Sequence, residues 1–274
     1  MIPAAFDYVR ASSADEAIAL IQAHGEDAKF LAGGMSLIPL MKLRLATPTV
    51  LVDLGRVADL SYVTDAGDHL AIGALTRHRF LETNELLTKE CGVLRAVAAQ
   101  VGDNQVRHRG TIGGSVAHGD PASDLPAALL ALDATFVVRG PGGERTVPAA
   151  DFFQGFLETA LAPDEMLVEV RVPKVGGAGF SYQKFQRRAQ DWAIVGAIAA
   201  RVNGGVHVAL VNMGSTPVRA SAVEAALAQG ASPADAAEHA ADATEPAADL
   251  NASVEYREHL ARVLTRRALE AASS

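Results

Sequence analysis

The chain has 274 residues, of which 49% are hydrophobic and 20% are charged. This composition is typical of globular proteins and excludes collagen, coiled coils and disordered chains. The 24 Lys and Arg residues against 32 Asp and Glu residues give a formal net charge of -8, which argues against a whole surface that binds nucleic acid. At roughly 150 residues per domain, this length predicts about two domains.

The cysteine content limits the cofactors that this chain alone can hold. The one cysteine, Cys91, excludes a disulfide framework, an iron–sulfur cluster ligated only by this chain and a cysteine-rich zinc module. Residues 1–10 lack the apolar core of a signal peptide, and no apolar stretch is long enough to span a bilayer. We therefore expect a cytoplasmic protein.

The N-terminal part of the chain predicts a small βαβ lobe. An extended piece at 6–9 precedes a helix in which Ser13 and Glu16 form a capping box, and Gly25 ends that helix. The elements that follow are a strand, a glycine turn, a helix and a strand, at 29–32, 33–36, 37–45 and 49–54.

The next part predicts a larger lobe of mixed structure. Extended runs at 61–64 and 69–72 form a hairpin. A helix at 93–101 leads into 102–123, which holds five glycines and little apolar periodicity, and we predict a long functional loop there. A helix at 122–132, capped by Ser123, is followed by extended runs at 134–139, 144–147 and 166–172.

Pro173 and the glycine cluster at 176–179 predict a domain boundary. Beyond it we expect an antiparallel sheet of at least three strands, because Asn203-Gly204-Gly205 is a strong hairpin signal. The expected strands cover 180–187, 193–202 and 206–213, and the expected helices of the alanine-rich tail cover 219–229, 233–241 and 254–272.

Two glycine turns carry the strongest chemical signal. The turn at 31–36, Leu-Ala-Gly-Gly-Met-Ser, lies between a strand and a helix start, where unpaired backbone N–H groups favour an anion such as pyrophosphate. It is neither a Gly-x-Gly-x-x-Gly fingerprint nor a P-loop, and on its own it favours a tight loop that holds no ligand. A second turn at 110–115, followed by Asp124, offers groups that suit sugar or ribityl hydroxyls. Together the turns indicate a long, phosphate-bearing cofactor.

The two motifs, Ala-Gly-Gly-x-Ser-Leu at 32–37 and Thr-Ile-Gly-Gly at 111–114 followed by Asp124, carry a family resemblance. The chain resembles the FAD-carrying medium subunits of molybdenum hydroxylases, most narrowly those of aerobic carbon monoxide dehydrogenase and its xanthine dehydrogenase relatives. The resemblance implies an α+β fold with a two-lobed PCMH-type FAD-binding domain and a C-terminal domain built on a three-stranded antiparallel sheet and helices. The implied bounds are 1–176 for the first domain, with lobes at about 1–55 and 56–176, and 177–274 for the second.

The same resemblance implies which residues bind FAD. The loop that would wrap the pyrophosphate contains Ala32, Gly33, Gly34, Met35, Ser36 and Leu37. The second flavin loop, with a carboxylate for ribityl or ribose hydroxyls, contains Thr111, Gly113, Gly114, Ser115 and Asp124. The residues expected near the flavin ring are Leu167, Lys184, Asp191 and Trp192. Met35 and Ser115 depart from the family, which often has His or Gln and Asn there, so the flavin potential or affinity is expected to differ.

The function implied by the resemblance is that of an oxidoreductase subunit with no catalytic side chain and no metal ligand of its own. FAD on this chain would pass electrons from [2Fe-2S] clusters on a small partner subunit to a quinone or another acceptor. A large molybdopterin subunit would oxidise the substrate. The complex is expected to be a cytoplasmic dimer of heterotrimers, associated with the inner face of the cell membrane, and to bind no nucleic acid.

The sequence leaves several alternatives open. Carbon monoxide, a purine, an N-heterocycle or an aldehyde would each fit, because substrate specificity lies in another chain. A self-contained flavin oxidase would need a pocket acid or base, and an interaction module would use the glycine turns only as structure. Trp192 is also compatible with a core position, and the basic run at 107–109 with a partner-facing surface. His78, His108 and His118 lack metal-ligand spacing and are assigned no catalysis.

Overall fold

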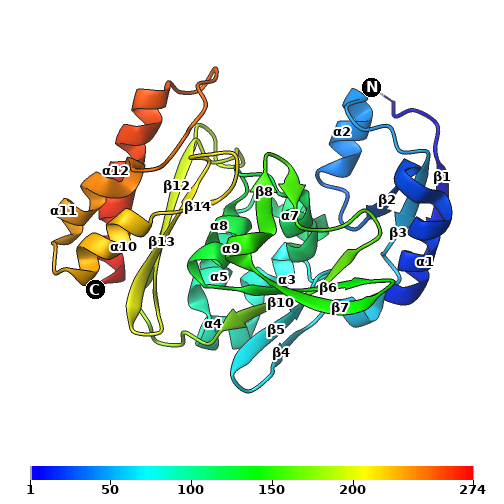
Figure 1. Cartoon of the computed structure of the whole chain (residues 1–274), viewed down its shortest axis with the longest axis horizontal. Coiled ribbons are helices and arrows are strands. Elements are labelled where there is room, and N and C mark those ends of the chain that lie inside the picture. Colours follow the sequence, from blue (N-terminus) through cyan, green and yellow to red (C-terminus); the bar gives the residue numbers. More distant parts are fainter. Residues whose placement is uncertain (1, 274) are drawn as a thin grey trace.

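The computed structural model describes residues 2–273 and arranges them as a small N-terminal lobe, a middle lobe and a C-terminal domain, side by side along the long axis (Figure 1). The predicted α+β class is confirmed. Met1 and Ser274, at the outer ends of the predicted domains, lie outside the described residues.

The small lobe is a parallel sheet in the order β1-β3-β2, as the predicted βαβ unit requires. Ser13 caps the first helix by accepting from the Glu16 N–H, and Gly25 ends it at a φ of 65°. The capping box is incomplete, because the Glu16 carboxylate accepts from Ser12 instead of Ser13. The elements are β1 (Asp7–Arg10), α1 (Ala14–His24), β2 (Ala28–Leu31), α2 (Leu37–Leu43) and β3 (Val50–Asp53), with a 3-10 turn at Gly25–Asp27.

The middle lobe is built on a five-stranded antiparallel sheet in the order β4-β5-β10-β6-β7. Its strands are β4 (Val63–Asp65), β5 (His69–Gly73), β6 (Thr135–Gly140), β7 (Gly143–Pro148) and β10 (Met166–Pro173), and a small hairpin adds β8 (Phe153–Gly155) and β9 (Glu158–Thr159). Its helices are α3 (His78–Thr83), α4 (Glu85–Glu90), α5 (Gly92–Ala98), α6 (Asn104–Arg109), α7 (Ile112–His118), α8 (Asp124–Ala131) and α9 (Ala149–Phe152), with a 3-10 turn at Ala58–Leu60.

The prediction of a long loop at 102–123 is wrong, because this segment contains the helices α6 and α7. Each helix begins at a side-chain cap, Asp103 for α6 and Thr111 for α7. Apolar periodicity could not reveal them, since α6 has no buried residue and α7 spans fewer than two turns of helix.

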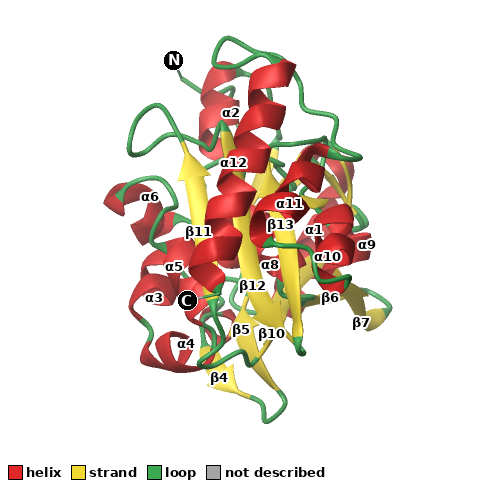
Figure 2. Cartoon of the chain, turned by 90° about the vertical axis from the view of Figure 1, so that its left-hand side faces the viewer, coloured by secondary structure: helices red, strands yellow, loops and turns green. Residues whose placement is uncertain are grey.

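The C-terminal domain is a four-stranded antiparallel sheet, β11-β12-β13-β14, with α12 lying across its outer face (Figure 2). The expected three strands are present, and the fourth is a two-residue edge strand that pairs with Ala209 and Leu210, too short for an alternation pattern to show. The elements are β11 (Phe180–Phe185), β12 (Val195–Val202), β13 (Gly205–Val211), β14 (Val218–Arg219), α10 (Ser221–Ala228), α11 (Pro233–Ala237) and α12 (Val254–Ala272), with a 3-10 turn at Glu238–Ala241.

Buried side chains join the three bodies. In β12, Ala197 and Ala199 pack with α10–α12, whereas Ile198 and Ala200 belong to the core of the middle lobe, because successive strand residues point to opposite faces of a sheet. The five-stranded sheet likewise shares Val137, Met166 and Val168 with the core of the small lobe. Within residues 2–273, no helix is long and apolar enough to cross a membrane.

Candidate cofactor site

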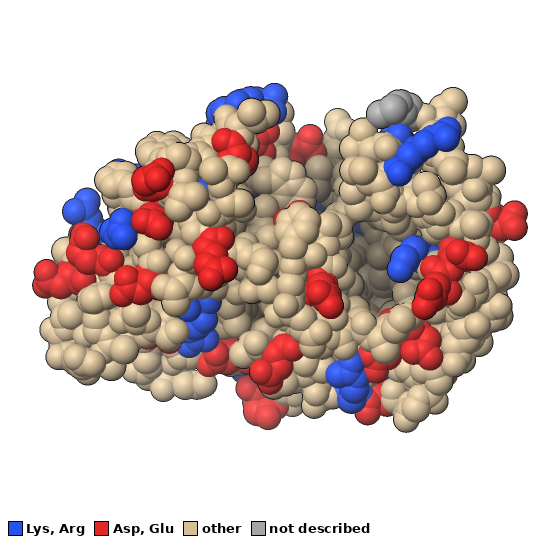
Figure 3. Space-filling model, turned by 45° about the horizontal axis from the view of Figure 1, so that its top comes forward, with Lys and Arg blue, Asp and Glu red and all other residues tan. Residues whose placement is uncertain are grey.

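The two predicted glycine loops meet, although about eighty residues separate them along the chain. A Cβ atom on Gly33 would overlap the carbonyl oxygen of Arg109, which directly precedes the second loop. A Cβ atom on Gly114 would come within 4.0 Å of the Ala32 side chain. The first loop belongs to the small lobe and the second to the middle lobe, and Figure 3 shows the surface hollowed between these lobes. The structure therefore brings both motifs to one place.

The first loop presents unused backbone donors. Within residues 2–273, the N–H groups of Gly33, Gly34, Met35 and Ser36 donate to no other residue, and the Ser36 hydroxyl has no hydrogen-bond partner. Gly34 has a φ of +73°, a conformation that glycine adopts at little cost. The loop opens α2, where the Ile38 N–H donates to the Gly34 carbonyl. Consecutive free N–H groups at the start of a helix favour an anionic oxygen.

The second loop is held by its own hydrogen bonds. The Thr111 hydroxyl oxygen accepts from the Gly114 N–H at 3.1 Å, and the Gly113 N–H donates to the Ala74 carbonyl at 2.8 Å. A Cβ atom on Gly113 would lie 2.5 Å from the Ala74 Cβ atom, so glycine is required by close packing. This loop consequently offers a ligand the Ser115 hydroxyl more than backbone N–H groups.

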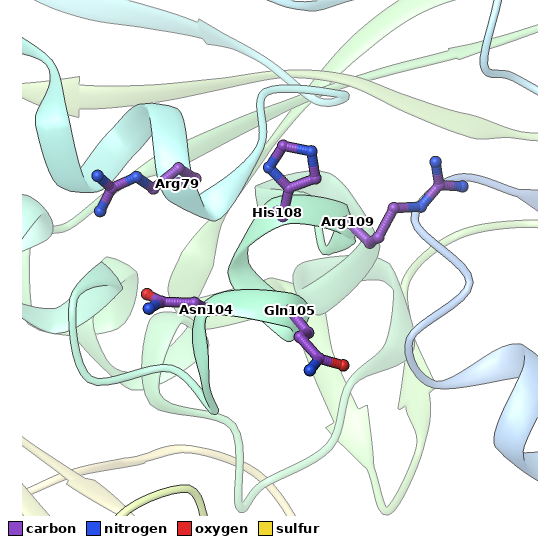
Figure 4. Close-up of a pocket in the computed structure, with 5 residues that line it drawn as sticks. All are labelled: Arg79, Asn104, Gln105, His108 and Arg109. Atoms are coloured by element: carbon purple, nitrogen blue, oxygen red, sulfur yellow. The ribbon is translucent and has the colours of Figure 1, made fainter.

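Positive charge surrounds the contact between the loops. The Arg77 guanidinium donates to the Arg109 carbonyl, and burial together with the Arg109 charge lowers the pKa of Arg77. A shallow hollow of about 520 Å³ lies on α3 and α6 beside this contact, and in Figure 4 the Arg109 side chain extends toward the small lobe. The residues that line the hollow are Arg79, Asn104, Gln105, His108 and Arg109. In the sequence, the basic run at 107–109 indicates this surface, whereas no local pattern marks Arg79, Asn104 and Gln105.

Asp124 and Lys184 face each other in the interior. The Asp124 carboxylate accepts from Lys184 Nζ at 2.7 Å and from the Tyr182 hydroxyl at 2.6 Å, and Lys184 Nζ also donates to the Gln100 carbonyl at 2.9 Å. Burial raises the pKa of Asp124, against the opposing effect of Lys184, and burial with the neighbouring carboxylate raises the pKa of Tyr182. This buried cluster joins α8 to β11. Sequence reasoning did not pair these residues or include Tyr182.

The remaining predicted residues lie on both sides of the loops. Leu167 is 5% exposed and precedes Val168, whose carbonyl accepts from Ala74, the residue packed on Gly113. Trp192 follows β11 and is 57% exposed, so it is not a core residue. Asp191 beside it is paired with Arg188. An exposed tryptophan next to a polar turn is available to a ligand or a partner.

Comparison with known proteins gives consistent matches over the whole chain. Residues 4–175 match the family described as the FAD binding domain in molybdopterin dehydrogenase, and residues 180–272 match the CO dehydrogenase flavoprotein C-terminal domain. The carbon monoxide dehydrogenase medium chain of Hydrogenophaga pseudoflava is 41% identical, with 99% of this chain and 98% of that one aligned.

Two further matches show the range of relatives. Subunit alpha of the 6-hydroxypseudooxynicotine dehydrogenase complex of Paenarthrobacter nicotinovorans is 37% identical over 98% of this chain and 95% of its own length. The solved structure of the H. pseudoflava carbon monoxide dehydrogenase, in a form that lacks the Mo-pyranopterin moiety of its molybdenum cofactor, superimposes with a TM-score of 0.96 at 42% identity, covering 100% of this chain and 99% of that chain.

Proposed function

The chain belongs to the family of FAD-binding flavoprotein subunits of molybdopterin dehydrogenases, and we propose that it is the medium subunit of a molybdenum-containing carbon monoxide dehydrogenase. The observation that carries this proposal is the full-length match to a carbon monoxide dehydrogenase medium chain, in both sequence and structure. The chain is an oxidoreductase component, and its family supplies an FAD-binding domain.

The residues at the two loops fit FAD. The free N–H groups from Gly33 to Ser36 suit a pyrophosphate, and Arg77 and Arg109 supply positive charge beside them. Leu37 continues the first loop into α2. When bound, FAD supplies the acceptance and release of electrons, which is chemistry of the cofactor and not of side chains.

The task of this chain is then to bind and orient the flavin nucleotide. Its tight inter-loop contact at Gly33 fixes the small lobe against the middle lobe, so the donors of the first loop are preorganised before the anion binds. The Asp124–Lys184 pair fixes β11 on the middle lobe, and β11 leads to Asp191 and Trp192. We propose that Leu167, Lys184, Asp191 and Trp192 lie nearest the flavin ring, as the resemblance implies.

Partners complete the proposed function. A large molybdopterin subunit would oxidise carbon monoxide, and [2Fe-2S] clusters on a small subunit would deliver the electrons to this chain. We also propose that the complex is a dimer of heterotrimers, that a quinone is its electron acceptor and that it associates with the inner face of the membrane. The proposed division into an FAD-binding domain at 1–176 and a C-terminal domain at 177–274 is supported by the glycine-rich segment before β11.

The relative that acts on 6-hydroxypseudooxynicotine favours a second candidate, the flavoprotein subunit of a hydroxylase for an N-heterocycle. The test is to purify the chain with its partners, identify them by mass, analyse flavin, iron and molybdenum, and add carbon monoxide or a heterocycle without oxygen. Bleaching of the flavin by carbon monoxide supports the first candidate. Bleaching by the heterocycle alone would favour the second, and a flavin on an isolated chain reduced directly by substrate would contradict both.

A further inference from the structure

A buried histidine contacts the second loop and has no place in the function described so far. His78 is 2% exposed and opens α3, where its N–H donates to the Gly110 carbonyl at 3.0 Å. Its Nε2 atom lies 3.3 Å from the Ser115 hydroxyl oxygen. Its Nδ1 atom is buried and has no hydrogen-bond partner among the described residues.

The unpartnered Nδ1 atom decides which ring nitrogen carries the proton. A buried N–H donor without an acceptor is costly and rare, whereas an acceptor without a donor is tolerated more often. The imidazole is also neutral, because burial and the charges of Arg77 and Arg107 lower the pKa of His78 to about 4. The neutral ring therefore carries its proton on Nε2 and donates it to Ser115.

The direction of this hydrogen bond determines whether the Ser115 hydroxyl can donate a hydrogen bond to a ligand. Because its oxygen accepts from His78, its own proton points elsewhere, and no other described residue accepts it. Ser115 follows Gly114, which faces Ala32 at the start of the first loop. The residue next to this contact between the loops therefore has a hydroxyl proton without an acceptor among the described residues, and the first loop has free N–H groups from Gly33 to Ser36.

We propose that His78 is a positioning residue that orients the Ser115 hydroxyl as a hydrogen-bond donor to an acceptor oxygen of the bound flavin nucleotide. This inference rests on the proposed function, since it assigns an acceptor on FAD. His78 acts through Ser115 and does not itself touch the cofactor.

The test is a double-mutant cycle on the flavin-stripped full chain, titrated with FAD and followed by flavin fluorescence. Loss of a hydrogen bond to an acceptor oxygen of FAD predicts that Ser115→Ala weakens FAD binding by about 10-fold. His78→Met places an adaptable side chain in the buried site. In the chain that retains Ser115, it is expected to weaken FAD binding by about fivefold or more. In the chain that carries Ser115→Ala, it is expected to weaken FAD binding no further. His78→Gln is the matched control, because its amide N–H reaches the Nε2 position, and it should restore most of the affinity.

The result that overturns the proposal is an equal effect of His78→Met in both backgrounds, which a purely structural role would produce. A second measurement needs no folded variant: the ¹⁵N chemical shifts of the His78 ring in the wild-type chain report the protonated nitrogen. Protonation at Nε2 supports the proposal, and protonation at Nδ1 overturns it. A wild-type chain that binds no FAD would overturn the proposed function as well, whereas FAD binding with an additive cycle overturns this inference alone.

Discussion

At the scale of residues, two close contacts hold the candidate site together: Gly33 packs on the Arg109 carbonyl oxygen, and the Asp124 carboxylate accepts from Lys184 Nζ at 2.7 Å. The first loop could be identified from the sequence because a glycine turn between a strand and a helix start determines its own backbone donors, and the structure leaves these donors free. The Asp124–Lys184 pair joins residues 60 apart in the sequence, and no local pattern shows where such side chains meet. The sequence does not show the contact of Ser115 with His78 either, because 37 residues separate the two.

The contact of Gly33 with Arg109 predicts that Gly33→Ala forces the two loops apart. We expect a loss of about 1–3 kcal/mol in the free energy of unfolding, the usual cost of overpacking, and at least tenfold weaker FAD binding. Gly142→Ala is the matched control, since a Cβ atom there meets nothing within 4 Å. Denaturant unfolding and FAD titration check both effects, and unchanged FAD affinity in Gly33→Ala would contradict the assignment of the loop.

The buried pair predicts a pH dependence. Lys184 lowers the pKa of Asp124, so Lys184→Met raises the folded-state pKa further above the unfolded value of about 4. The unfolded state then releases its proton first, and stability is complete below about pH 4 and falls as the pH rises toward the folded pKa, by about 1.4 kcal/mol per pH unit.

At neutral pH the expected loss for Lys184→Met is about 3–5 kcal/mol, because a buried carboxylate lacks its cation. Denaturant unfolding across this pH range measures the slope. Adding Asp124→Asn should remove the part of the pH dependence that Lys184→Met introduces, since this buried carboxylate no longer titrates. A pH profile for Lys184→Met that runs parallel to that of the wild type would show that the pair is not buried as the structure has it.

At the scale of elements, apolar periodicity predicts the long helices and strands but does not reveal the short ones. The sequence predicted α12 with its observed bounds, Val254–Ala272, because five turns of helix give a clear apolar stripe. It also predicted the β12–β13 hairpin. It does not show α6, α7 and β14, because each is too short to show a period. Side-chain caps determine where α6 and α7 begin, and pairing with β13 determines β14.

The hairpin carries a prediction of its own. Asn203 and Gly204 form the two-residue turn, and both have positive φ, 50° and 83°. An L-residue in this region costs about 1–2 kcal/mol, so Gly204→Ala should lower the free energy of unfolding by about that amount. Gly205→Ala, where φ is not positive and the nearest atom is 3.8 Å away, should change it little. Equal stabilities of the two variants in denaturant would contradict this account.

At the scale of the whole molecule, the layers depend on which strand faces are buried. The apolar runs of β12 and β10 predict strands. They do not show that Ile198 of β12 packs in the core of the middle lobe while Ala199 packs against the C-terminal helices. The order of the strands and the contact between the two glycine loops likewise depend on tertiary packing. The family resemblance supplied this architecture, and the structure and the comparisons confirm it.

Shared cores predict cooperative unfolding. Because Ile198 and Ala200 pack in the core of the middle lobe, and Val137 and Val168 pack in that of the small lobe, the three bodies should unfold in one calorimetric transition. Two resolved transitions would indicate that one body is stable alone. Ile198→Ala should lower the free energy of unfolding by about 2–5 kcal/mol without splitting that transition.

We propose that this chain holds the flavin through which electrons leave a carbon monoxide dehydrogenase. The most direct test compares the purified complex with one that carries Gly33→Val in this chain, each given carbon monoxide without oxygen and then a soluble quinone. We expect both complexes to reduce their iron–sulfur clusters, but only the wild-type complex to contain flavin and to reduce the quinone. Undiminished quinone reduction by the flavin-free complex, or no response of either complex to carbon monoxide, would contradict it.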